Sequence, residues 1–130
     1  MAVRIRLDIK VTISENPSES NELGKTTPWV GVNDQQEDGG SWSQTIAAST
    51  VDQLVDLNGL VDGTFLAIKT DQIIDIKKNA AGGEPWTIQP LGVGALDGFF
   101  IISTTGVTEL YVSNAGAIDA KVTFMVAGTN

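Results

Sequence analysis

The chain has 130 residues, of which 42% are hydrophobic and 18% are charged. This length fits one domain, residues 1–130, and the hydrophobic content is enough for a core, which excludes a largely disordered protein. There is no cysteine and no histidine, so disulfides, thiolate metal sites and the commonest general base are excluded. The formal charge of −8 opposes binding to a phosphate backbone, and we therefore expect no nucleic-acid partner.

The N-terminal residues alternate between apolar and polar side chains and predict one long strand. Odd positions from Val3 to Ile13 are apolar, whereas Arg4, Arg6 and Lys10 fall on the other row. The apolar row is expected to face a core, and the basic row to face either water or an acidic partner surface. This alternation is unlike a signal peptide, and no segment reaches the ~20 apolar residues of a membrane span, so we expect synthesis in a cytoplasm and no membrane partner.

Two polar stretches are predicted to be exposed. Residues 15–25 lack periodicity and are expected to form a loop or arm, and residues 33–41 are expected to form a second loop. The second stretch carries oxygen-bearing side chains ahead of two glycines, namely Asn33, Asp34, Glu37 and Asp38. Such a loop suits calcium, but the spacing differs from that of an EF-hand, so we favour a solvated loop and predict no metal and no cofactor.

The middle of the chain predicts several strands. Alternation indicates a half-buried strand at residues 42–47. Residues 50–55 fit either one or two helical turns or a strand, and we favour the strand. Residues 64–70 are apolar on both faces, so they must be covered on both sides, and the turn that follows predicts a hairpin with residues 73–78.

The C-terminal third predicts three further strands, residues 99–104, 109–114 and 120–127, with glycines in the turns at Gly106 and Gly116. Two antiparallel hairpins so close together indicate an all-β domain.

The first of these strands opens with Phe99, Phe100, Ile101 and Ile102, which are apolar on both faces. In a two-layer sandwich only one face of each strand meets the core, so the surplus must be covered. Either a loop or the arm folds over it, or it is a subunit interface.

Trp86 is the tryptophan that we expect to be exposed. It lies between Pro85 and Pro90, which limit its segment to a short strand that is not central, because proline has no N–H for the ladder. An exposed aromatic face can stack on a sugar ring or anchor an interface.

No catalytic group stands out in the sequence. The sixteen acidic side chains supply many candidate carboxylate pairs but single out none, and most lie beside turns. No serine has a nucleophile-elbow context, and no glycine-rich stretch precedes a helix. We therefore predict that the protein is not an enzyme and has no catalytic residues.

The pattern from Thr64 to Gly128 resembles small jelly-roll proteins on the virions of tailed bacteriophages. The segments that carry the resemblance are residues 65–68, 88–91, 100–102, 110–114 and 122–124. The resemblance implies an all-β fold, an antiparallel, jelly-roll-like β-sandwich. It also implies a structural virion protein of the capsid decoration or cement type, a homotrimer bound to the major capsid protein.

The resemblance assigns no contact residue, so the interface candidates come from the sequence pattern alone. They are Arg4, Arg6, Lys10, Trp86, Phe99, Phe100, Ile101 and Ile102. The alternative function is a carbohydrate-binding or receptor-binding module of a tail or head fibre, which would use exposed tryptophan and loop carboxylates.

Overall fold

A computed structural model describes residues 3–9, 29–36, 38–57, 59–90 and 97–129. All regular structure in these residues is β. The ten strands are β1 Val3–Ile9, β2 Trp29–Gln36, β3 Asp38–Ile46, β4 Thr50–Val55, β5 Asp62–Thr70, β6 Ile74–Lys78, β7 Trp86–Ile88, β8 Gly98–Val107, β9 Leu110–Asn114 and β10 Ala120–Thr129.

The strands fall into two compact units. Residues 2–36 make one unit, in which β1 and β2 form a two-stranded antiparallel sheet with Ile9 opposite Trp29. Strands β3 to β10 belong to the other unit. The predicted N-terminal strand is confirmed over Val3–Ile9, whereas its continuation and the arm predicted at residues 15–25 lie outside the described residues.

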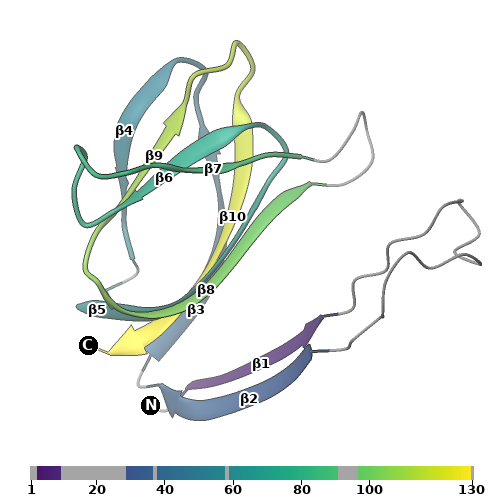
Figure 1. Ribbon diagram of the computed structural model, residues 1–130, viewed down its shortest axis with the longest axis vertical. Coiled ribbons are helices and arrows are strands. Elements are labelled where there is room, and N and C mark those ends of the chain that lie inside the picture. Colours follow the sequence, from purple (N-terminus) through teal and green to yellow (C-terminus); the bar gives the residue numbers. More distant parts are fainter. Residues whose placement is uncertain (1–2, 10–28, 37, 58, 91–96, 130) are drawn as a thin grey trace, which may run out of the picture. The chain divides into compact units, whose positions relative to one another are not determined.

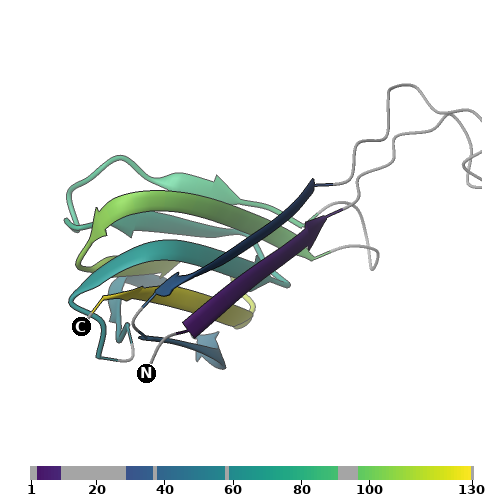
Figure 2. The same cartoon turned by 90° about the horizontal axis from the view of Figure 1, so that it is seen from below.

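The larger unit is a β-sandwich of two antiparallel four-stranded sheets, as predicted (Figures 1 and 2). One sheet has the order β3-β10-β5-β8 and the other has the order β4-β9-β6-β7. Four antiparallel pairs are nested in the chain, with β6·β7 innermost and β5·β8, β4·β9 and β3·β10 successively outside it. This nesting is the pattern of one long hairpin wound over both layers.

The three predicted hairpins are wrong. Strands β5 and β6 lie in different sheets, and so do β8 and β9, and β9 and β10. Of the predicted turn glycines, Gly116 lies in the turn between β9 and β10, whereas Gly106 lies within β8. Turn positions do not decide which strands pair. Each of these strands has an apolar face that packs into the core between the two sheets, so consecutive strands can belong to opposite sheets.

The loop predicted at residues 33–41 is also wrong. Asn33 pairs with Ile5 in the small sheet, and Asp38 to Ser41 pair with β10. Gly39 serves close strand packing rather than a loop, because a Cβ there would lie 2.7 Å from the carbonyl oxygen of Val126.

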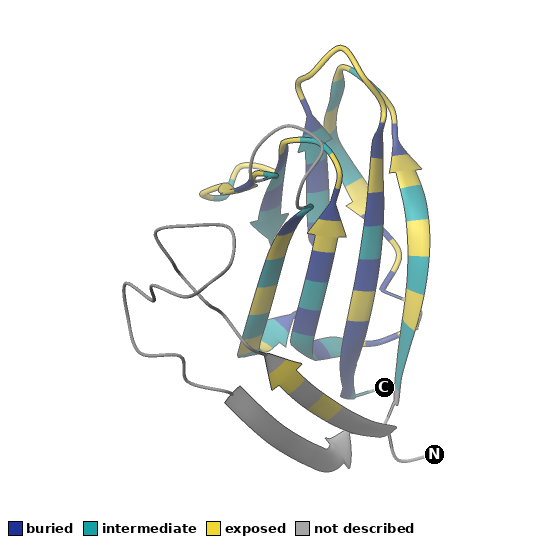
Figure 3. Ribbon diagram, turned by 90° about the vertical axis from the view of Figure 1, so that its right-hand side faces the viewer, coloured by how far each residue is buried: buried dark blue, intermediate teal, exposed yellow. Residues whose placement is uncertain are grey.

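Alternate residues of the sandwich strands form one core between the sheets (Figure 3). Phe124 is fully buried near its centre, and the ring of Trp42 stacks on it with centroids 5.4 Å apart. The strand favoured at residues 50–55 is confirmed as β4, and the short non-central strand at Trp86 is confirmed as β7, at the edge of its sheet.

Candidate interaction surfaces

Strand β8 divides its four large apolar residues between two faces. Phe100 and Ile102 pack against the core, whereas Phe99 is 54% exposed and Ile101 is also exposed. The prediction that this strand is apolar on both faces is therefore confirmed. Only two of the four candidate interface residues, Phe99 and Ile101, lie on the outer face.

The exposed residues of β8 continue into a larger apolar surface across the sheet. Ile101 lies opposite Ala67 of β5, which lies opposite Met125 of β10, and Met125 is exposed. We call Phe99, Ile101, Ala67 and Met125 the β8 patch. Lys69 lies opposite Phe99 at its margin and is 3.5 Å from the Asp97 carboxylate.

Trp86 is exposed as predicted, with 40% of its surface accessible. Its ring is tilted against that of Phe100, with centroids 5.1 Å apart. Trp86 therefore joins the edge of one sheet to the edge of the other and leaves part of its own surface open.

The basic candidates of the N-terminal strand are described only in part. Arg6 is exposed and its Nε donates a hydrogen bond to Oδ2 of Asp8 at 2.7 Å. Arg4 lies in β1, but its side chain is outside the described part, as is all of Lys10. An exposed pair such as Arg6–Asp8 contributes about 0–1 kcal/mol, so it adds little to stability, and Asp8 offsets one of the three basic charges on the predicted row.

A second apolar surface, which was not predicted, lies at one end of the sandwich. The turns at residues 47–49, 71–73 and 115–119 meet there, and they carry exposed Ile73 and Ile118. Val51, just inside β4, is exposed as well. We call these three turns with Val51 the loop end. The available signal was the presence of isolated large aliphatic residues within polar or small-residue turns.

Hydrogen bonds between the turns hold the loop end together. The Ser49 N–H donates to the Gly116 carbonyl at 3.2 Å, and the Ala48 N–H donates to the Asp119 carboxylate at 2.9 Å. Asp71 and Lys121 are joined by two bonds, because the Lys121 N–H donates to the Asp71 carboxylate at 2.8 Å and the Asp71 N–H donates to the Lys121 carbonyl at 3.3 Å.

Asn114 anchors the same region from inside the sandwich. Its side chain is fully buried, and its Nδ2 donates to the carbonyls of Ile46 at 3.1 Å and Ile118 at 2.9 Å. Its Oδ1 accepts the Gly116 N–H at 3.0 Å. The bonds to Ile118 and Gly116 fix the turn that carries Ile118, and the bond to Ile46 ties Asn114 to β3, so the Ile118 side chain is presented on a rigid support.

A shallow groove of about 270 Å³ adjoins the loop end. It is lined by Gln72, Ile73, Ile74, Asp75, Ser113, Asn114, Ala115 and Gly116. The groove brings the turn at residues 71–73 beside the turn at residues 115–119, which makes the two turns parts of one surface.

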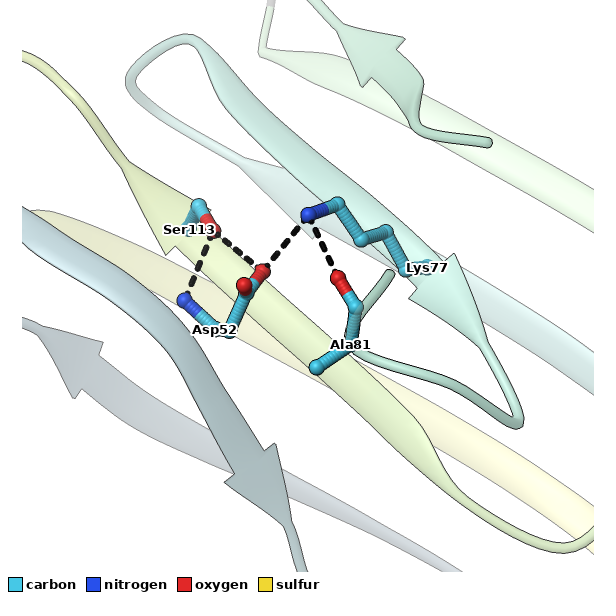
Figure 4. Close-up of polar contacts among 4 residues, drawn as sticks. All are labelled: Asp52, Lys77, Ala81 and Ser113. Atoms are coloured by element: carbon cyan, nitrogen blue, oxygen red, sulfur yellow. Dashed lines mark hydrogen bonds and ion pairs between the residues drawn. The ribbon is translucent and has the colours of Figure 1, made fainter. Parts of the chain in front are cut away.

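The outer face of the β4-β9-β6-β7 sheet carries a polar network centred on Asp52 (Figure 4). The Asp52 carboxylate accepts bonds from Lys77 Nζ at 2.8 Å and from Ser113 Oγ at 3.2 Å, and the Asp52 N–H donates to Ser113 Oγ at 2.8 Å. Lys77 also donates to the Ala81 carbonyl at 2.8 Å. The hydrogen bond from Lys77 lowers the pKa of Asp52.

In this network the Ser113 hydroxyl is bonded to a carboxylate and to a backbone N–H, and the Lys77 ammonium donates to two oxygens. Nearby, the Tyr111 hydroxyl donates to the Glu109 carboxylate, which raises the pKa of Tyr111. The network joins β4, β9, β6 and the turn after β6.

The described residues contain neither a cluster of metal-ligating side chains nor a membrane-spanning helix. Across the described ranges, no three acidic side chains gather closely enough to hold a metal ion. Asp34 and Asp38, which were considered as calcium ligands, lie in strands β2 and β3, and Glu37 is outside the described part. The described chain contains no helix with the length and hydropathy of a membrane span.

Comparisons of this chain with protein families, with curated proteins and with solved structures found no match.

Proposed function

We propose that the protein is a structural component of a virion, a decoration or cement protein that binds the assembled head of a tailed bacteriophage. The observation that carries this proposal is the loop end, where Ile73 and Ile118 are exposed on turns that hydrogen bonds hold in place and Val51 is exposed just inside β4. A rigid apolar projection loses little conformational freedom on binding, so it suits a preformed hollow on a folded partner. The partner in this proposal is the major capsid protein.

The proposed mechanism is non-covalent clamping. A contact that exists only on the assembled shell adds its free energy to the assembled state alone, which shifts the equilibrium away from dissociated capsomers. The nested strand pairs of the sandwich fit the jelly-roll arrangement of the virion proteins that the sequence resembles. As in that group, we propose a homotrimer located in the virion.

The test is binding to capsids of the encoding virus that lack this protein. Burying one isoleucine contributes roughly 1.5–3 kcal/mol, so Ile118→Asp should weaken binding by about 10-fold to 100-fold. Val61→Asp is the matched control, because Val61 is 65% exposed against 64% for Ile118 and precedes the opposite end of β5. Binding is measured by co-sedimentation, and shell stability by the temperature at which the capsids release DNA.

Capsids that bind the wild type and Val61→Asp equally, but not Ile118→Asp, would support the proposal. Failure of the wild type to bind, or equal binding of all three proteins, would contradict it.

The alternative of a carbohydrate-binding or receptor-binding module rests on Trp86, which is partly exposed at a sheet edge. Saturable binding to a glycan panel by the wild type, abolished in Trp86→Ala, would favour this module over the capsid protein.

A further inference from the structure

Strand β8 is an edge strand with an open segment. It pairs with β5 on one side, and no other strand in the described part of the chain pairs with it. Near its two ends β8 contacts other parts of the chain, because a Cβ on Gly98 would lie 2.7 Å from the backbone of Gln89, and the Gly106 N–H donates to the Asp62 carboxylate at 2.8 Å. We call the residues between these contacts, 99–105, the open segment.

This edge lacks the devices that normally block strand addition. None of the ten residues of β8 is charged or proline. Two of the other three edges of the sandwich are protected, because β7 has three residues and follows Pro85, and β4 contains a register shift between Thr50 and Gln53. The third edge, β3, carries a charge only at its first residue, Asp38. The length of β8, its lack of charge and its exposed apolar residues together point to a strand–strand contact at this edge.

The side chains of β8 add an apolar surface to the open backbone. Phe99 and Ile101 face outward from the same segment and lead into Ala67 and Met125. A strand added along β8 would cover this margin of the β8 patch, because neighbouring strands place their side chains on a shared face about 5 Å apart. The open backbone and the exposed side chains therefore both fit the same partner, an extended strand with apolar residues on one face.

We propose that a second copy of this chain is that occupant and that copies associate along β8. The partner's β8 meets the requirements, since it offers an open backbone edge and its own Phe99 and Ile101 on the matching face. It also has no charge, so the contact avoids the repulsion expected between two chains of formal charge −8. A contact between two β8 strands joins copies in pairs about a two-fold axis, so it is a different contact from the one that would close the proposed homotrimer, and it is independent of capsid binding.

The test measures the mass of the purified full-length protein by light scattering at about 100 µM chain, a concentration that reveals micromolar association. Ile101→Lys and Ser103→Lys place a charge on the open segment. Ser103 is exposed and small, so its replacement leaves the core untouched even if Ile101→Lys unfolds. Leu54→Lys is the control, an apolar-to-lysine change at a 56% exposed residue on edge strand β4 of the other sheet. Thermal unfolding followed by circular dichroism checks each fold.

We expect a wild-type mass that is an even multiple of 13.7 kDa, retained by Leu54→Lys. Folded Ser103→Lys should associate at least about tenfold more weakly. A monomeric wild type, or an oligomer that Ser103→Lys leaves intact, would overturn the inference. Capsid binding is scored separately. An intact oligomer that does not bind capsids contradicts the proposed function alone, and capsid binding by a monomer contradicts the β8 contact alone.

Discussion

Asp52 holds three strands together from an uncommon backbone conformation. Its φ is 48°, in the left-handed region where aspartate and asparagine are tolerated better than most residues. The register of β4 against β9 shifts between Thr50 and Gln53, so Asp52 lies in a bulge. Its bonds to Ser113 and Lys77 replace the ladder contacts that the bulge interrupts.

The lowered pKa of Asp52 predicts a pH-dependent contribution to stability. Because the pKa of Asp52 in the folded protein lies below its ordinary value of 3.8, the contribution is present above that pH and is lost as the pH falls below it. Asp52→Asn suits the backbone conformation but removes the charge. We expect its urea midpoint to be lower than that of the wild type at pH 6, with a difference that shrinks below pH 3.8.

Asp97→Asn is the control for this experiment, since Asp97 lies 3.5 Å from Lys69 and both side chains are more exposed than those of Asp52 and Lys77. It should leave the midpoint nearly unchanged at both pH values. A difference between Asp52→Asn and wild type that stays constant with pH would show that the carboxylate charge is not what the network uses.

Among the strands, the closest approach is between β10 and β5. The register shifts between Ala127 and Gly128, and Gly128 lies opposite Gly63. A Cβ on Gly128 would be 2.0 Å from the Asp62 carbonyl oxygen and 2.9 Å from the Gly63 Cα, so backbone atoms rather than flexible side chains would have to move.

We therefore expect Gly128→Ala to lower the free energy of unfolding by about 1–3 kcal/mol or more, through overpacking of two central strands. Gly82→Ala is the matched control, because a Cβ there has no atom within 4 Å and its φ is not positive, so this change should be neutral or slightly stabilising. Urea unfolding measures both. Equal midpoints for the two variants would contradict the close approach.

Strand positions could be predicted from the sequence, but strand partners could not. Alternation located the strand that contains Val122 and Phe124, and it favoured β4 over a helix. The pairing of strands depends on which apolar faces pack against each other across the core, and the residues that form those faces are distributed along the whole sandwich. The glycines at 39 and 40 were misread for a related reason, since a glycine needed for close packing looks the same in sequence as one in a flexible loop.

Like the strand partners, the candidate interaction surfaces could be predicted only in part from the sequence. The β8 patch was anticipated through Phe99 and Ile101, because four consecutive large apolar residues exceed what one core face can bury. The loop end was missed, because Ile73 and Ile118 lie 45 positions apart and only the fold brings their turns together. No pattern within a single stretch of sequence predicts a surface that three separate turns form together.

At the scale of the whole molecule, the division into two units predicts that the sandwich folds by itself. Every residue of the core cluster, from Ile46 to Val126, belongs to the larger unit. A chain that begins at residue 37 keeps β3 to β10 and all of this core, so we expect cooperative unfolding with a Tm within about 5 °C of that of the full chain. Differential scanning calorimetry measures both transitions.

A chain that begins at residue 48 is the control for this truncation. It lacks β3, so β10 loses one of its two neighbours, and the core loses Ile46, which is fully buried. Removing a buried side chain of this size costs about 2–5 kcal/mol even before the lost strand pairing is counted, and small domains have only about 5–15 kcal/mol in total. We expect no cooperative transition in this shorter chain. If the chain from residue 37 also lacked one, the sandwich would depend on residues 1–36, and the smaller unit would have to be treated as part of its fold.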